Sequence, residues 1–142
     1  MPTDTVQLSA AITTFMLDNW THTPMCLRGS NGFDLTGQHS GNLNDLGVDF
    51  IEFDFNNTAR RPAGISRDSG FRVMGFLDIQ IFTDVGQGNM KLAEIEHQLF
   101  TLLERKTINT AQIRTALNVS RPYEFRGKLT KTVSFPLEYF QS

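Results

Sequence analysis

The chain has 142 residues, of which 39% are hydrophobic and 20% are charged, and its formal net charge is −2. One domain typically takes about 100–200 residues, and this composition is typical of a folded globular protein rather than a disordered one. The slightly acidic balance excludes a protein that attracts nucleic acid by its overall charge, so any DNA contact must come from a local patch. We therefore expect a single domain over residues 1–142.

Cys26 is the only cysteine, which excludes an internal disulfide, and a buried small hydrophobic side chain is its simplest interpretation. The start of the chain, MPTDTVQLSA, lacks the basic beginning and apolar centre of a signal peptide. No stretch approaches the ~18–20 apolar residues of a membrane span. The sequence thus predicts a protein that folds in a cytoplasm and has no membrane partner.

A first helix is predicted from Asp4 or Thr5 to about Asn19, with Gln7 placed three residues after Asp4 as in a capping box. Apolar residues then recur at helical spacing on one face: Leu8, Ile12, Phe15, Met16 and Trp20. The apolar residues 25–27 predict a short strand after this helix.

Residues 28–47 contain five of the 11 glycines, separated by asparagine, serine and aspartate. Glycine and asparagine tolerate positive φ and disfavour regular structure, so the segment is predicted to be a long loop or mobile arm. Such loops beyond ~12–15 residues tend to be functional or disordered.

Residues 48–55 alternate between apolar and acidic side chains, which predicts a half-buried strand. A second polar loop or arm follows at 56–70, and it would be the tip of an extended hairpin because 71–82 is again a strand. Arg60, Arg61 and Arg67 concentrate positive charge in this segment. The charge indicates either a solvated tip or a contact with an acidic partner or DNA.

Gly86 and Gly88 follow the second long strand and precede a helix that is predicted to begin at Asn89. A strand, a glycine turn and a helix can hold a phosphate, but a phosphate-binding loop needs a Ser or Thr after its lysine, and Lys91 has none. A dinucleotide fingerprint would need glycine where Lys91 stands. We therefore interpret Gly86 and Gly88 as a turn that is a signature of the fold, and not as a cofactor site.

The second helix carries an apolar stripe at Leu92, Ile95, Leu99, Leu102 and Leu103. Residues 106–119 then predict a connecting strand, with Ile108, Ile113 and Leu117 as its apolar positions.

The tail alternates over a long span, and one face is predicted to hold its apolar positions: Tyr123, Phe125, Leu129, Val133, Phe135, Leu137 and Tyr139. Gly127 predicts a bulge or bend, and Pro136 predicts a sheet edge. The order of elements predicts an α+β fold, with two main helices packed on one face of a mostly antiparallel sheet that carries long loops.

Catalytic motifs are incomplete throughout. Glu94 and His97 share a helical face, but di-iron bundles need this motif twice, and His22 with Cys26 lacks the second ligand pair of a zinc site. No G-x-S-x-G elbow occurs. Carboxylates such as Glu52 and Asp54 on the polar face of a strand are usually just solvated. We expect no enzyme, metal or cofactor, and instead an interface of basic residues: Arg60, Arg61, Arg67, Arg72, Arg126 and Lys128.

Three features together resemble the tail terminator proteins of long-tailed bacteriophages, also called tail completion or minor tail proteins. An N-terminal helix ends in FMLDNW (15–20), and the strand FRVMGFLDIQIFTDVGQG (71–88) has an internal glycine and a Gly-x-Gly exit. The helix KLAEIEHQLF (91–100) follows. The resemblance spans residues 10–140, and the glycine-rich 28–47 loop has no counterpart in it.

The resemblance implies a structural virion protein at the head-proximal end of the tail, assembled in the host cytoplasm. Its copies would form a hexameric ring that caps the major tail tube protein, ends tube growth and joins the head or neck connector. DNA would pass through the lumen without sequence-specific binding. Two alternatives stay open: a head–neck connector or stopper ring, and a small nucleotide- or metal-dependent enzyme built around Gly86–Gly88.

Overall fold

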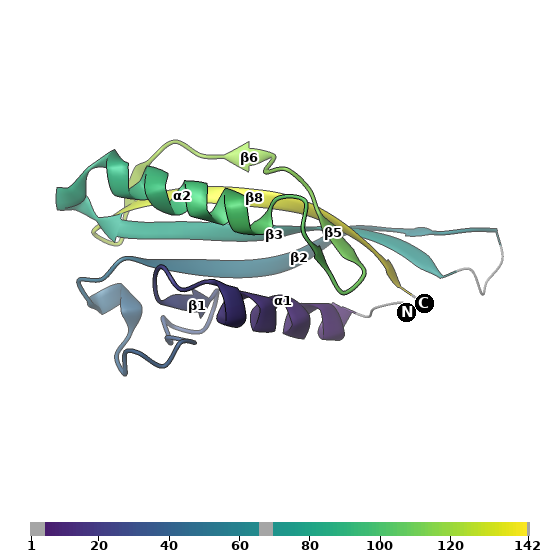
Figure 1. Ribbon diagram of the computed structural model, residues 1–142, viewed down its shortest axis with the longest axis horizontal. Helices are drawn as coiled ribbons and strands as arrows, with labels where there is room; N and C mark the ends of the chain where they lie inside the picture. The colour runs from purple at the N-terminus through teal and green to yellow at the C-terminus, as the bar shows by residue number, and fades with distance from the viewer. Residues whose placement is uncertain (1–4, 66–69, 142) are drawn as a thin grey trace.

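The computed structural model describes residues 5–65 and 70–141, which form two helices and one sheet (Figure 1). The helices are α1 (Thr5–Asn19) and α2 (Asn89–Leu103), and two short 3-10 turns are η1 (Leu43–Asp45) and η3 (Val85–Gln87). The strands are β1 (Met25–Leu27), β2 (Phe50–Pro62), β3 (Phe71–Asp84), β4 (Thr107–Ile108), β5 (Ala111–Ile113), β6 (Asn118–Val119), β7 (Tyr123–Phe125) and β8 (Lys128–Gln141).

The sheet has the strand order β1-β2-β3-β8-β5-β4, and β6 and β7 also pair with β8. β1 runs parallel to β2, whereas β2, β3 and β8 form two long antiparallel ladders. The predicted α+β class with a mostly antiparallel sheet is therefore confirmed. None of the described helices is long and apolar enough to cross a membrane.

Both helices pack on the same face of the sheet, as predicted. Cross-strand partners such as Phe53 and Ile79, or Leu77 and Phe135, put their side chains on one face because paired residues share a face. One buried cluster joins that face to the apolar stripes of both helices: Leu8, Ile12, Met16, Ile51, Phe53, Val73, Leu77, Ile79, Ile81, Leu92, Ile95, Leu99, Leu103, Val133, Phe135, Leu137 and Tyr139. On the same side, Lys131 of β8 pairs with Glu96 of α2.

The first half of the second predicted loop, residues 56–62, is strand. β2 continues through Pro62 and β3 begins at Phe71, so the two strands form a hairpin arm that projects past the helices (Figure 1). The loop prediction was wrong for 56–62 because polar side chains are compatible with a strand whose faces are both exposed. Inside the arm, Gly75 lies against β2 so closely that a Cβ would stand 2.4 Å from the Asn56 carbonyl oxygen.

One long edge of the sheet is open. β1 covers only Ile51–Phe53 of β2, so from Asp54 to Pro62 the described part of the chain places β3 on one side of β2 and no strand on the other. The register also shifts between Asn57 and Ala59, a bulge of the kind that is common at sheet edges.

The tail is a hairpin and not one continuous strand. Arg126 and Gly127 have φ values of 54° and 75°, and they form a two-residue turn between the partners Phe125 and Lys128. Gly127 is thus a turn glycine rather than a bulge. Because partners across a hairpin share a face, Tyr123 and Phe125 lie on the face opposite Val133, and their predicted placement with the core was wrong.

Two further predictions, one about Pro136 and one about residues 106–119, were wrong. Pro136 lies in β8, between β3 and the β5–β6 side, and not at an edge. The Pro136 carbonyl accepts from Arg114 N–H (2.8 Å). The nitrogen and the carbonyl of one residue in an antiparallel strand point to the same side, so the Pro136 nitrogen faces the β5–β6 side. β5 has ended at that position, so the missing N–H of proline costs no ladder hydrogen bond. The segment 106–119 is three short strands, with Ile108 and Ile113 buried but Leu117 66% exposed.

The glycine-rich 28–47 segment is a long loop, as predicted, but it is folded onto the body rather than free. It covers the end of the face away from the helices, where Cys26, Leu43, Phe50 and Phe82 form a second buried cluster. The Phe50 and Phe82 rings stack with their centroids 4.6 Å apart.

Buried Asp34 organises this loop. Its carboxylate accepts from Thr36 N–H (2.9 Å), Thr36 Oγ1 (2.6 Å) and His39 N–H (3.1 Å). Burial by itself raises the pKa of Asp34, but the hydrogen bonds from Thr36 and His39 outweigh it and the pKa is lowered.

Candidate functional site

The sheet face away from the helices carries polar side chains over its middle part. We call it the open face, and its middle rows are Glu52, Asp54, Asp78, Gln80, Thr132 and Ser134. These residues alternate with the buried core positions of β2, β3 and β8, so the same alternation that builds the core also sets this polar surface. We take the open face and the arm that continues it as the candidate site.

Two carboxylates face each other at the centre of the open face. Asp54 and Asp78 are direct partners in the β2–β3 ladder. The amide of Asn56 donates to an oxygen of Asp54 (3.0 Å) and of Asp78 (3.4 Å), and Ser134 Oγ donates to Asp78 (2.6 Å). Like charges placed directly opposite one another destabilise a sheet, so this pair is maintained at a cost to the isolated chain.

Arg28 is shared by two acids of this face. Its guanidinium lies 3.8 Å from Glu52 Oε1 and 3.7 Å from Asp54 Oδ2. The side chain of Glu52 is only 9% exposed, and the Cys26 thiol donates weakly to it at 3.9 Å. Burial, and then the nearby Glu52 and Asp34 carboxylates, raise the pKa of Cys26 to about 12. The thiol is therefore protonated at neutral pH and is a poor nucleophile.

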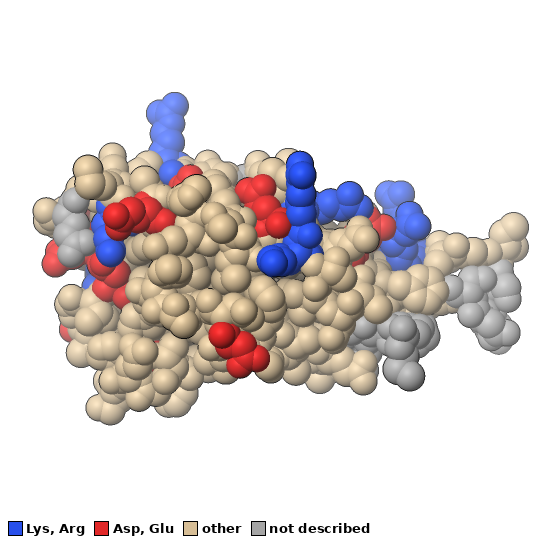
Figure 2. All heavy atoms as spheres, viewed as in Figure 1, with Lys and Arg blue, Asp and Glu red and all other residues tan. Residues whose placement is uncertain are grey.

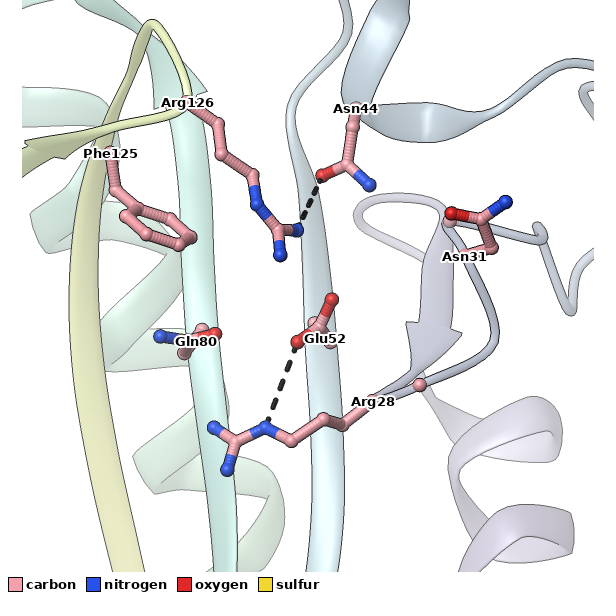
Figure 3. A pocket seen from close by; sticks show the side chains of 9 residues that line it. Arg28, Asn31, Asn44, Glu52, Gln80, Phe125 and Arg126 are labelled. Atoms are coloured by element: carbon pink, nitrogen blue, oxygen red, sulfur yellow. Dashed lines mark hydrogen bonds and ion pairs between the residues drawn. The ribbon is translucent and has the colours of Figure 1, made fainter.

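A cleft of about 700 Å³ opens beside Glu52, between the sheet and the glycine-rich loop (Figure 3). Arg28 and Arg126 reach into it from opposite sides, and Gln80 and Phe125 contribute from the sheet and the tail hairpin (Figure 3). The lining thus combines two guanidinium groups with one nearly buried carboxylate. Such a lining suits polar and charged groups rather than an apolar small molecule.

Two of the predicted interface residues serve the chain itself. Arg126 donates to Asn44 Oδ1 (3.3 Å) and lies over the Phe125 ring at 4.8 Å. Lys128 is buried, and its ammonium donates to the Val48 carbonyl (3.1 Å). The two contacts hold the glycine-rich loop and the residue that follows it to the tail hairpin. Lys128 is therefore a structural residue rather than an accessible interface residue.

Three other predicted basic residues, Arg60, Arg61 and Arg72, lie on the arm. Arg61 and Arg72 are direct cross-strand partners, and Arg72 pairs with Glu138 (3.0 Å). Arg60 stacks on the Phe71 ring, 3.7 Å from its centroid, on the other face of the arm. Arg67 lies outside the described residues. Figure 2 shows basic side chains where the arm leaves the body, and acidic side chains gathered toward the opposite end.

The Gly86–Gly88 turn has the role predicted for it in the fold. Asp84 accepts from Gly86 N–H (3.3 Å) at the start of η3, and Gly88 begins α2 with φ 67° and ψ −164°. This backbone region is available essentially only to glycine. The cleft described above is not lined by the turn.

The described residues contain no group of three or more His, Cys, Asp or Glu side chains placed to hold a metal ion. Glu94 pairs with Lys91 of its own helix (3.6 Å) and lies on an exposed surface. The geometry of the open face therefore supports recognition of charged groups, through carboxylates at its centre and guanidinium groups on the arm.

Three important residues of this face were not singled out from the sequence as site residues: Arg28, Asp78 and Glu138. Their contacts join residues that are 24 or more positions apart in sequence, and these contacts depend on the register of the strands. The one available signal was the alternation of acidic and apolar residues in β3, where Asp78 stands between Leu77 and Ile79.

No family model matches the sequence, and comparison with curated proteins gives no match. A solved structure of nearly the same length does share the fold, with a TM-score of 0.64 and 12% sequence identity. The superposition covers 94% of this chain and 93% of the other, and that protein carries no name that states a function. Likeness at this identity shows the fold alone.

Proposed function

We propose that this chain is a structural subunit of a bacteriophage tail, which caps the tail tube at its head-proximal end as a ring of identical copies. The observation that carries the proposal is the open edge of β2, from Asp54 to Pro62, on an arm that projects past the body. A long unpaired strand edge promotes aggregation of a monomer, whereas in an assembly it can pair with another chain.

A ring needs heterologous contacts, in which one surface of a copy meets a different surface of the next. The basic arm and the acidic middle of the open face lie at different positions along the same sheet, so they can meet only between copies. The sequence resemblance to tail terminator proteins supports the same function. In this role the chain has no catalytic step, and its partners are its own copies, the tail tube protein and the neck.

Tail length tests the proposal. Phage particles assembled without this gene should carry tail tubes of irregular and excessive length, because nothing ends their polymerisation. Negative-stain electron microscopy measures the length distribution, and restoring the gene from a plasmid is the control. Tails of normal, uniform length in the deletion strain would contradict the proposal.

A related function, a connector or stopper ring at the neck, predicts a different binding partner. Purified protein should bind isolated tail tubes under the tail proposal and DNA-filled heads under the connector alternative. Sedimentation of each particle with the labelled protein distinguishes the two.

A further inference from the structure

Two like-charge pairs stand on one face of the β2–β3 hairpin. The acidic pair is Asp54 with Asp78, and the basic pair is Arg61 with Arg72. The residues of each pair are direct cross-strand partners, and both pairs point to the open face because Asp78 and Arg72 are separated by an even number of positions on β3. Each pair is unfavourable in its own chain.

Each pair also belongs to a larger set of the same sign with too few counter-charges. Glu52, Asp54 and Asp78 form the acidic set, and Arg28 is the one described residue within ion-pair distance of it. Arg61, Arg72 and Arg114 form the basic set, and Glu138 is its one described ion-pair partner, 3.0 Å from Arg72 and 3.3 Å from Arg114. Arg61 has no ion pair among the described residues. Each set thus has three like charges and one counter-charge.

Apolar side chains separate the two sets. Met74 is 44% exposed, and Phe76 and Pro136 are partly exposed beside it on the same face. Phe140, 40% exposed, is the partner of Arg72 and extends the apolar surface beside the basic set. The six positions from Asp78 to Arg72 span about 20 Å at ~3.3 Å per residue. The open face therefore presents an acidic set, an apolar strip and a basic set in sequence, which is the composition of a surface that another protein covers.

We propose that this face binds a second copy of this chain, with the Arg61–Arg72 pair of one copy set against the Asp54–Asp78 pair of the other. The partner is identified by charge complementarity: a copy of the chain supplies both the cations that the acidic pair lacks and the anions that the basic pair lacks. The contact relieves both intrachain repulsions and buries the apolar strip between them. The proposal goes beyond the tail function and does not depend on it.

Single charge reversals test the contact without threatening the fold. Asp54→Lys places an ammonium opposite Asp78, and Arg61→Glu places a carboxylate opposite Arg72, so each variant gains an opposite-charge pair within its own chain. Each reversal also neutralises one of the two surfaces. We expect association of each variant to be weakened about tenfold or more, because close charge pairs across an interface contribute strongly.

Sedimentation velocity at low salt measures association of the wild-type chain, of each variant and of their equimolar mixture. The wild-type chain should associate, and less so as salt screens the charges. Each variant alone should stay monomeric at the same concentration. The mixture should associate again, since the normal arm of Asp54→Lys meets the normal acidic pair of Arg61→Glu, and the two reversed charges meet each other with opposite sign. Asp18→Lys, on the exposed side of α1, is the matched control and should behave as wild type.

Three results would each overturn the inference: a wild-type chain that stays monomeric at every concentration in low salt, a single reversal that associates like wild type, or a mixture that does not regain association. Circular dichroism and urea unfolding of each variant establish that it is folded. Tails of normal length in the deletion strain would rule out the proposed function but would not affect the test of self-association. A chain that stays monomeric in solution would rule out this inference but would not affect the tail-length test.

Discussion

Asp54 and Asp78 stand directly opposite each other across β2 and β3, bridged by the amide of Asn56. Two carboxylates in this position lower the stability of the isolated chain. The contact proposed above between copies would offset this cost in the associated state. Stability and association should respond in opposite directions to changes at this pair.

Asp54→Asn should raise the free energy of unfolding by about 0.2–1 kcal/mol, because it removes the repulsion and keeps an oxygen for Asn56. The lost ion pair with Arg28, at 3.7 Å between side chains that are 46% and 30% exposed, is worth little. Urea unfolding measures the change. Glu124→Gln, an exposed acid on β7, is the control and should have no such effect, and a less stable Asp54→Asn chain would contradict the interpretation.

Asp34 should make the stability of the chain depend on pH. Its folded pKa is lowered from the ordinary value of 3.8, so its stabilisation is present above that value and is lost as pH falls through the folded pKa. Asp34→Asn should therefore be less stable than wild type at pH 7, by about 1–3 kcal/mol, because the partly buried donors of Thr36 and His39 lose a charged acceptor. The difference in urea midpoint should shrink below pH 3.8, and a difference independent of pH would refute the assignment.

Gly88 and Gly86 should respond differently to alanine. Gly88→Ala forces a side chain into a backbone region that only glycine adopts readily, and we expect a loss of about 1–3 kcal/mol. At Gly86 a Cβ would find its nearest neighbour, Asp84 Oδ1, at 4.0 Å, so Gly86→Ala should change stability by less than ~0.5 kcal/mol. Thermal unfolding of the two variants makes the comparison, and equal losses would show that the turn is not set by Gly88.

Cys26 should be unreactive in the folded chain. Burial and neighbouring carboxylates raise its pKa to about 12, and it belongs to the cluster under the glycine-rich loop. A thiol reagent at neutral pH should modify it only as fast as that cluster opens. Lys128→Met, which removes the contact to the Val48 carbonyl, should increase the rate, whereas Lys106→Met at an exposed site should not. Rapid modification of wild type would contradict the buried position.

Three arginines singled out from the sequence should matter for assembly more than for folding. Changing Arg60, Arg61 and Arg67 together to Ala should leave the fold intact and reduce the yield of infectious particles. Arg60→Ala alone should cost about 0.5–1 kcal/mol through the lost stack on Phe71, so the Arg61 and Arg67 changes test assembly more cleanly. Plaque counts and urea unfolding measure the two effects. Full particle yield from the triple variant would rule out this role of the arm.

Local patterns in the sequence predicted the core and the elements that build it. The helical spacing of Leu92, Ile95 and Leu99 and the alternation around Ile79 both match the buried cluster. The predictions that were wrong concern residues whose position depends on the pairing of strands. The Arg126–Gly127 turn reversed the tail and moved Tyr123 to the opposite face, which alternation alone does not reveal because both strands of a hairpin alternate.

The candidate site was less predictable than the fold for the same reason. The arginines of the arm were visible in sequence, but the opposition of Asp54 to Asp78, and of Arg61 to Arg72, exists only in the ladder. Lys128 was expected at an interface from its charge, and its ammonium is taken up by a backbone carbonyl 80 positions away in sequence. Sequence alone does not show which charges are accessible.

The position of β8 has a consequence for the chain while it is being made. This strand is the last in sequence, yet it lies between β3 and β5 and pairs with β3 from Asp84 to Phe71. A nascent chain that ends at residue 127 has both helices and the arm but lacks the strand that completes the core. At about 5–20 residues per second on the ribosome, β3 waits for several seconds with an unpaired edge. Its solubility during synthesis depends on keeping that edge from other nascent chains until residues 128–141 emerge.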